Sequence, residues 1–443
     1  MTRQCSDSPF APRRWPFFYG WFILAAGTLG AVFSVPGQTI GVSAFNEPLM
    51  DAMGLDRMGI SFAYMLGTVA SSFLLTWVGR FYDRFGARVT AGLASAALGA
   101  VLIALSRMDA AAAAIGRLVG RPESVAVAFG VAVVGFFLLR FVGQGVLTLS
   151  CRNMVMKWFD HRRGLANGIM NVFVPPIFAV SPLLFALLID RFGWSGTWRL
   201  AGAVIGAGLT VFVLVFFRDN PESCGLLPDG GATARPRDPR HHPARDFDLP
   251  EARRTYAFWV FNLALAAQAL YLTAITFHVE DLFAQRGYGR MVAFMQFSPS
   301  AALAVVTGFV GGWISDHVRL KWILVFMLTM MGLSMVGALA LGWGPAIYLH
   351  VAARGLSVGV FGLLLAMTWP RLFGRTHLGA ISGFNMTWIV LFSAIGPAAF
   401  GLSKTLTGGY VAALALCLAA VAILALLALR ADRPEPPEAP TEA

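Results

Sequence analysis

The sequence predicts an all-α membrane protein with twelve transmembrane helices, arranged as two pseudo-symmetric halves of six helices each. Of its 443 residues, 57% are hydrophobic and only 13% are charged, whereas about a quarter of the residues in a typical soluble domain are charged. The apolar runs are about 20 residues long, the length that a helix needs to cross the hydrocarbon core. Motifs of the first half return in order in the second half, which indicates an internal duplication.

Twelve apolar segments are long enough to span a bilayer, and runs of this length exclude the short strands of a membrane β-barrel. We expect the helices at residues 17–39, 58–79, 88–106, 125–153, 163–189, 196–217, 256–278, 291–312, 321–341, 345–370, 379–403 and 408–430.

Basic residues set the predicted orientation. The net charge is +11, and Lys and Arg gather in the N-terminus, the central segment and alternate loops, as they do on the cytoplasmic side of membrane proteins. Because apolar runs separate these residues, the basic balance favours a membrane protein over a nucleic-acid-binding one. We therefore predict a monomeric, multi-pass protein of the bacterial inner membrane, with both termini in the cytoplasm and no nucleic acid partner.

The polar segments divide the chain into parts. We expect a cytoplasmic N-terminus (1–16), a first six-helix half (17–217), a cytoplasmic linker (218–255), a second six-helix half (256–430) and a disordered cytoplasmic tail (431–443). The linker is rich in proline and arginine, a composition that forms no packed core.

The internal repeat is visible in residues that keep their order in both halves. The matching pairs are Arg140 and Arg354, Gly145 and Gly359, Phe159 and Phe373, Gly79 and Gly312, and Asp83 and Asp316.

The loop between the second and third predicted helices carries the clearest motif. Its fixed positions are Gly79, Asp83, Arg84, Gly86 and Arg88, and the run resembles the G-x-x-x-D-R-x-G-x-R signature of the major facilitator superfamily of secondary transporters. The resemblance implies a gating contact that latches one conformation, in which Asp83 receives backbone N–H groups at a helix N-terminus. The alternative is a charged loop that only follows the inside-positive bias.

The second copy of this loop keeps Gly312 and Asp316 but lacks the second glycine. Two further pairs of glycines, Gly164 with Gly168 and Gly379 with Gly383, are small-xxx-small faces that allow close helix packing. They fit either a sliding gate or ordinary packing within one half.

Two arginines lie inside predicted helices, Arg140 in the fourth and Arg354 in the tenth. Such a residue costs about 2.5–3.5 kcal/mol on insertion scales, so it normally faces a cavity and serves function. No Asp or Glu lies in the middle of any predicted helix, and an anionic substrate is an attractive counter-ion. The alternative is that both arginines bond backbone carbonyls and brace the bundle. Gln144 shares the face of Arg140.

Other polar residues are candidate ligands for a substrate. Gln268, Tyr271 and His278 recur on one stripe of the seventh helix. His278 is the candidate for proton coupling, because histidine titrates near neutral pH; the alternative is an interfacial histidine without a role. The remaining candidates, on other helices, are Asn171, Asn385, Gln38 and Tyr64.

Short runs around the linker resemble one particular branch of this superfamily. Residues 221–230 (PESCGLLPDG), 251–259 (EARRTYAFW) and 276–278 (TFH) resemble bacterial relatives of the monocarboxylate and oxalate/formate porters. The acidic-glycine motif of the animal porters is absent from the first helix, and the eighth helix has no aspartate. Proton coupling by the animal-type mechanism is therefore not expected.

These observations predict a secondary active or facilitative transporter, a symporter, antiporter or uniporter, of a small organic anion resembling a monocarboxylate. The resemblance implies binding near the membrane midplane and alternating access. Two alternatives stay open: a drug or lipophile efflux transporter of the same fold, and a non-transporting membrane sensor or assembly partner. The sequence has no nucleotide-binding loop, metal-protease motif or nucleophile elbow, so we expect no enzyme, catalytic residue, metal site or cofactor.

Overall fold

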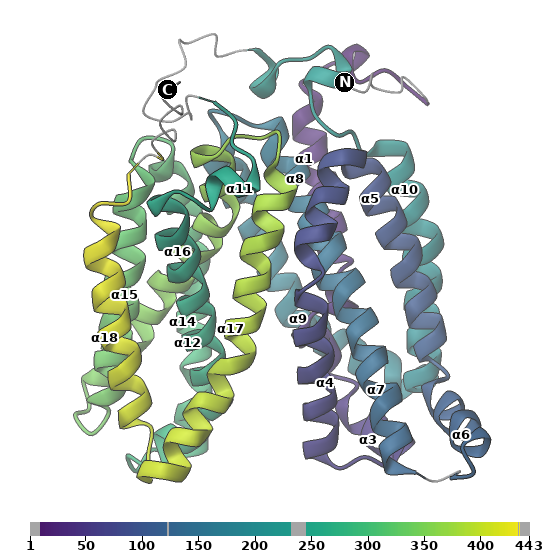
Figure 1. Ribbon diagram of the computed structural model, residues 1–443, viewed down its shortest axis with the longest axis vertical. Coiled ribbons are helices and arrows are strands. Elements are labelled where there is room, and N and C mark those ends of the chain that lie inside the picture. The colour runs from purple at the N-terminus through teal and green to yellow at the C-terminus, as the bar shows by residue number, and fades with distance from the viewer. Residues whose placement is uncertain (1–8, 122–123, 232–244, 433, 435–443) are drawn as a thin grey trace, which may run out of the picture. The chain divides into compact units, whose positions relative to one another are not determined.

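The computed structural model describes residues 9–121, 124–231, 245–432 and 434 (Figure 1). Within these residues all regular secondary structure is helical, as predicted. The centre of the predicted linker and most of the predicted tail lie outside the described residues.

The described residues of the first part of the chain form ten α-helices, with a π-helical segment at Arg140–Leu147 and another at Val204–Leu209. The α-helices are α1 (Tyr19–Val32), α2 (Thr39–Ser43), α3 (Asn46–Met53), α4 (Arg57–Ser72), α5 (Leu75–Leu105), α6 (Met108–Leu118), α7 (Val125–Leu139), α8 (Thr148–Trp158), α9 (Arg163–Ala203) and α10 (Thr210–Phe216).

Eight α-helices lie in the part of the structure described after residue 244. They are α11 (Leu249–Ala252), α12 (Tyr256–Ala284), α13 (Arg290–Met295), α14 (Phe297–Ser315), α15 (Leu320–Leu339), α16 (Ala346–Leu372), α17 (Leu378–Thr407) and α18 (Val411–Ala428).

Nine helical segments in the described part of the chain are long and apolar enough to cross a membrane. Two of them each combine parts of two predicted helices. Helix α5 changes direction at Gly86 (φ +83°), and the segment formed by α9 and α10 changes direction at Gly193 (φ +69°). Glycine adopts positive φ without a steric penalty, so these residues end one helix and begin the next. The shorter α1 is the first predicted helix, and α4 together with the start of α5 forms the second. Counted in this way, the segments account for the twelve predicted helices.

Several predicted boundaries differ from the observed ones, and the first and seventh helices show why. The first helix ends at Val32 rather than at residue 39, and a 3₁₀ turn at Val35–Gly37 follows it. Pro36 in this turn has no N–H to continue an α-helix. The seventh helix continues to Ala284, six residues beyond the predicted end at residue 278, because its amphipathic last turns remain helical outside the apolar run. Helix α6 lies between the third and fourth predicted helices.

The chain divides into two compact units. Unit 1 takes its described residues from 1–159, 173–232 and 382–387, and unit 2 takes its own from 160–172, 233–381 and 388–443. In unit 1, α1 packs on α8, α4 packs on α7, and α5 packs on both π-helical segments.

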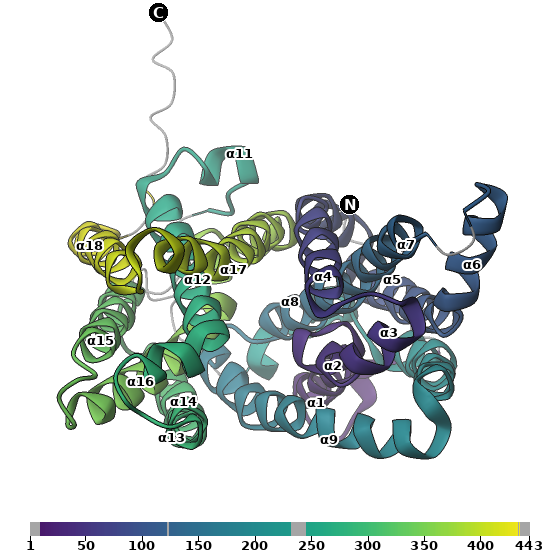
Figure 2. The ribbon, with the colours of Figure 1, turned by 90° about the horizontal axis from the view of Figure 1, so that it is seen from below.

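In unit 2, α16 packs against α14 and α15, while α12 packs against α16 and α18 (Figure 1 and Figure 2). The core of this unit is aliphatic and sulfur-rich, with fully buried Leu324, Met327, Leu363 and Met367. Helices α12 and α16 carry buried polar side chains within this core, among them Gln268 and Arg354.

Candidate functional site

Arg140 lies where the fourth predicted helix departs from α-helical geometry. It begins the π-helical segment between α7 and α8, and such segments frequently mark functional sites. Opposite this segment α1 has already ended, and Gly37 comes so close that a Cβ added there would lie 2.7 Å from the Cα of Gly143. The Gly37 carbonyl, released from helical bonding, accepts a hydrogen bond from Arg140 Nη1 at 2.9 Å.

The Arg140 side chain is only 4% exposed. Its guanidinium carbon lies 5.3 Å from the centre of the Tyr64 ring, and the Tyr64 hydroxyl donates to Thr39 Oγ1 at 2.8 Å. Its Nε has no hydrogen-bond partner, and no carboxylate pairs with Arg140 among the described residues. The carbonyl bond agrees with the bracing alternative, and the unused Nε leaves a donor for an anion.

The other predicted residues of unit 1 lie in the same region. Gln38 Nε2 donates to Ser34 Oγ at 2.9 Å and to Thr148 Oγ1 at 3.1 Å. Gln144 lies within the π-helical segment, between Arg140 and Thr148. Sequence reasoning missed Thr148, although it continues the four-residue spacing of Arg140 and Gln144.

Arg354 on α16 is 6% exposed and has a different environment. Its Nη1 donates to Ser300 Oγ at 3.4 Å, and its Nη2 donates to Thr276 Oγ1 at 3.3 Å. Its guanidinium carbon lies 4.8 Å from the centre of the Phe297 ring. Its Nε has no partner, and the described residues supply it with no carboxylate. Two long bonds to neutral hydroxyls leave this cation largely uncompensated.

The predicted stripe on α12 contacts the helices around Arg354. Gln268 Oε1 accepts a bond from Ser357 Oγ at 2.7 Å, and the Tyr271 hydroxyl lies 2.9 Å from Ser334 Oγ. Ser334 in turn contacts Nδ1 of His350, which is fully buried. Sequence reasoning missed His350, although it lies one turn before Arg354 on the same helix.

The two predicted asparagines belong to different units. Asn171 lies in unit 2 beside Gly308 and Gly362, where its amide would be 3.6 Å from a Cβ added to either glycine. Asn385 is fully buried and belongs to the short part of α17 that clusters with unit 1.

The loop motif of unit 1 forms the bend within α5. Asp83 Oδ1 lies 3.8 Å from Lys157 Nζ, and the N–H of Arg88 donates to Asp219 Oδ1 at 3.0 Å. A Cβ added to Gly86 would lie 2.1 Å from the Asp219 carboxylate, so this position accepts only glycine. Arg84 packs on the ring of Phe85, and Gly79 is buried one turn before Asp83. Sequence reasoning missed Asp219, which caps the helix that follows the bend.

Asp316 occupies the matching position in unit 2. Its Oδ1 accepts the backbone N–H of Gly164 at 3.1 Å, at the first turn of α9. Gly164 and Gly312 touch through their backbones, because a Cβ on Gly164 would lie 1.9 Å from the Gly312 oxygen. Burial raises the pKa of Asp316 to about 6, although the Gly164 N–H and the charge of Arg371 act in the opposite direction.

This raised pKa predicts a pH-dependent stability. The folded protein binds the Asp316 proton more tightly than the unfolded chain does, with a pKa of about 6 against 3.8. The stabilisation is therefore complete below about pH 4 and is lost as the pH rises through about 6. Asp316→Asn should flatten the apparent melting temperature between these values, removing a term of up to about 3 kcal/mol.

The measurement is thermal unfolding of the detergent-purified protein across this pH range. Asp109→Asn is the matched control, because Asp109 is exposed on α6, and it should keep the wild-type profile. An unchanged slope in Asp316→Asn would show that this carboxyl does not control the profile.

Comparisons with known proteins agree with this architecture. A family model described as Major Facilitator Superfamily matches residues 27–397. Monocarboxylate transporter 11 of Homo sapiens is 26% identical over 302 residues, which are 64% of this chain and 59% of that protein. The chain thus spans about three fifths of the length of this relative. The uncharacterized MFS-type transporter YcxA of Bacillus subtilis (strain 168) is 23% identical over 86% of this chain and 90% of its own.

Among solved structures, the chain is similar to the proton:xylose symporter XylE bound to 6-bromo-6-deoxy-D-glucose. The TM-score is 0.64 at 15% identity, with 93% of this chain and 95% of that chain covered. At this identity the likeness concerns the fold alone.

Proposed function

The chain belongs to the major facilitator superfamily, and from this premise we propose that it carries a small organic anion, resembling a monocarboxylate, by alternating access. It is a multi-pass membrane protein and a transporter rather than an enzyme. The proposal further places it in a bacterial inner membrane, as a monomer with both termini in the cytoplasm.

The observation that supports an anion most directly is the environment of Arg354. A buried cation is costly in a membrane unless an opposite charge or several acceptors compensate it. Arg354 has two hydroxyl partners at 3.3 and 3.4 Å and an unused Nε. A carboxylate can accept two parallel bonds from a guanidinium, which would compensate the charge and use the free donor.

Arg140 supports the same chemistry with a second, partly braced guanidinium in the other unit. Each unit therefore holds a buried arginine with an unused Nε. Asp83 and Asp316, with Gly79, Arg84, Gly86, Arg88 and Gly312, are proposed as gating residues because they lie at helix bends and ends.

The drug or lipophile efflux alternative makes a different demand on these residues. A neutral or cationic apolar substrate gains nothing from an uncompensated guanidinium, and placing it there would leave the cation buried and unpaired. The sensor alternative allows anion binding but predicts no flux.

Counterflow in proteoliposomes separates the three possibilities. Proteoliposomes that contain the purified protein are loaded with an unlabelled short-chain monocarboxylate. The entry of the labelled compound into their lumen is then followed. We expect transient accumulation that unlabelled carboxylates inhibit and that apolar cations do not. Flux of apolar cations without carboxylate counterflow would support efflux, and carboxylate binding without any flux would support a sensor.

A further inference from the structure

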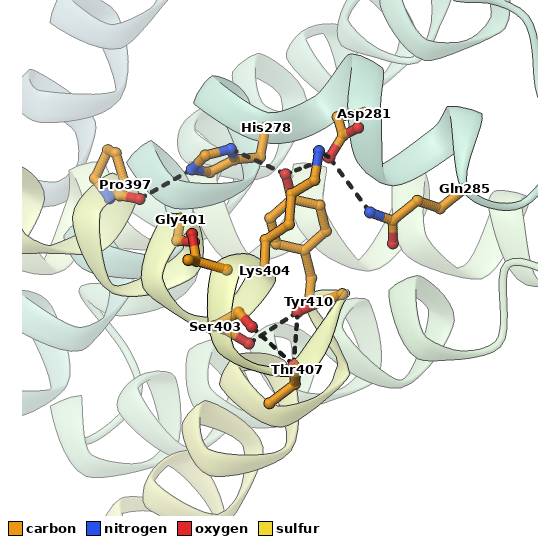
Figure 3. Close-up of polar contacts among 11 residues, drawn as sticks. His278, Asp281, Gln285, Pro397, Gly401, Ser403, Lys404, Thr407 and Tyr410 are labelled. Carbon is orange, nitrogen blue, oxygen red and sulfur yellow. Dashed lines mark hydrogen bonds and ion pairs between the residues drawn. The ribbon is translucent and has the colours of Figure 1, made fainter.

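A chain of polar contacts joins α12, α17 and Tyr410, the residue before α18 (Figure 3). His278 Nε2 lies 2.9 Å from the carbonyl oxygen of Pro397. His278 Nδ1 lies 3.2 Å from the hydroxyl of Tyr410, which also bonds the carboxylate of Asp281. The extension of α12 beyond its predicted end brings Asp281 within one turn of His278.

With His278 neutral, Tyr410 neutral and Asp281 ionised, the three contacts have one hydrogen too few for all of them to be hydrogen bonds. The Pro397 carbonyl can only accept, so Nε2 must carry a hydrogen. A neutral imidazole then has a bare lone pair at Nδ1. The single hydroxyl hydrogen of Tyr410 can satisfy either Nδ1 or Asp281, but not both. All three contacts become hydrogen bonds only when one further proton is bound.

The extra proton can be placed in two ways. It can reside on His278, so that imidazolium donates to Tyr410 and Tyr410 donates to Asp281, or it can reside on Asp281 with both bonds reversed. Lys404 Nζ lies 2.6 Å from Asp281 Oδ2, and Gln285 Nε2 donates to the same oxygen at 3.3 Å. These donors stabilise the ionised form of the Asp281 carboxylate.

Tyr410 is suited to relay this proton. Burial and the neighbouring Asp281 raise the pKa of Tyr410 above its ordinary value, so its hydroxyl keeps a hydrogen. The side chain of Asp281 is 40% exposed, and that of Lys404 is 45% exposed, while His278 is half-buried. Water therefore reaches the carboxylate end of the chain more easily than the imidazole end.

Other charged groups surround the chain on the packed helices. Glu280 is exposed beside Asp281 on α12, and Lys404 contributes from α17. From α16, Arg354 bonds Thr276, two residues before His278.

We propose that Asp281, Tyr410 and His278 form a site for one proton, which enters at the carboxylate and is passed through Tyr410 to the imidazole. In the transfer, the proton from water adds to Asp281, Tyr410 accepts it while giving its own hydrogen to Nδ1, and the carboxylate returns to its ionised form. This inference rests on the proposed function in one respect: the proton travels with the anion bound at Arg354.

Nitrogen-15 NMR of histidine-labelled protein in nanodiscs tests the site without requiring transport. The His278 signals are assigned by their absence from His278→Gln. Tyr410→Phe keeps the ring but removes the relay oxygen, and the pH at which the site is half-protonated should fall by about one unit, a tenfold loss of proton affinity. Tyr256→Phe is the matched control, because its hydroxyl bonds only the Leu427 carbonyl, and it should leave the titration unchanged.

Asp281→Asn is the second variant, and it should shift the titration in the same direction, which keeps the test decisive if Tyr410→Phe does not fold. Unshifted titrations in the folded variants would overturn the proton site.

Carboxylate uptake driven by a pH gradient then tests coupling, with exposed His317→Gln as control. A shifted titration without carboxylate flux would overturn the proposed function but not the site; gradient-driven uptake retained by Tyr410→Phe would overturn the relay.

Discussion

Replacing Arg354 with glutamine should weaken carboxylate binding by about ten- to a hundredfold, because one charge-assisted contact contributes about 1.5–3 kcal/mol. Arg354→Lys keeps the charge but loses the planar fork, so it should also lose much of the affinity. Arg140→Gln should act in the same direction less sharply, since the Gly37 carbonyl already occupies one of its donors.

The measurement is anion-dependent thermal stabilisation of purified variants, with melting in the absence of anion as the control for folding. Arg286→Gln is the matched control, because Arg286 is exposed in the same unit, and its affinity should equal that of the wild type. If both Arg354→Gln and Arg140→Gln bind carboxylates with wild-type affinity, the anion hypothesis is wrong and lipophile efflux becomes the better interpretation.

Adding one methyl group at Gly164 should impair the protein strongly. The Cβ would lie 1.9 Å from the Gly312 oxygen and 2.8 Å from the Asp316 carboxylate. Backbone atoms cannot rotate away, so the first turn of α9 must move, at a cost of about 1–3 kcal/mol or more. Gly164→Ala should lower both the melting temperature and the initial rate of counterflow, the latter at least about tenfold.

Gly168→Ala provides a matched control within the same small-xxx-small motif. Its Cβ would lie 3.4 Å from the nearest atom, the Phe309 oxygen, which is an ordinary contact that small adjustments relieve. This variant should stay close to the wild type in both assays. Equal behaviour of the two alanine variants would show that the close approach at Gly164 is not required.

The membrane-spanning segments could be predicted from hydropathy and length. In lipid the backbone must satisfy its own hydrogen bonds, so a long apolar run there must be a helix. The irregular geometry around Arg140 could not be predicted in this way. Its π-helical segment packs against Gly37 at Gly143, and those residues are more than a hundred positions apart in the chain. The proline in the 3₁₀ turn was visible in the sequence and would have placed the end of the first helix correctly.

The candidate site was predicted in the same uneven way. Helical spacing predicted that Gln144 lies on the face of Arg140 and that Gln268, Tyr271 and His278 share one stripe. Arg140 and Arg354 were singled out as charges inside apolar segments. Neither observation could identify Ser300 as a partner of Arg354, or Tyr410 as a partner of His278, because each pair joins separate helices. Asp281 was missed because the apolar run ends before the helix does.

Helix α6 is a structural difference between the two halves of the described chain. It occupies residues 108–118, between the third and fourth predicted helices, whereas in the second half only residues 340–345 join α15 to α16. The matching residues are spaced evenly on either side of this difference. If both halves descend from one ancestral six-helix gene, this difference arose after the duplication, by insertion of α6 into the first copy or by its loss from the second.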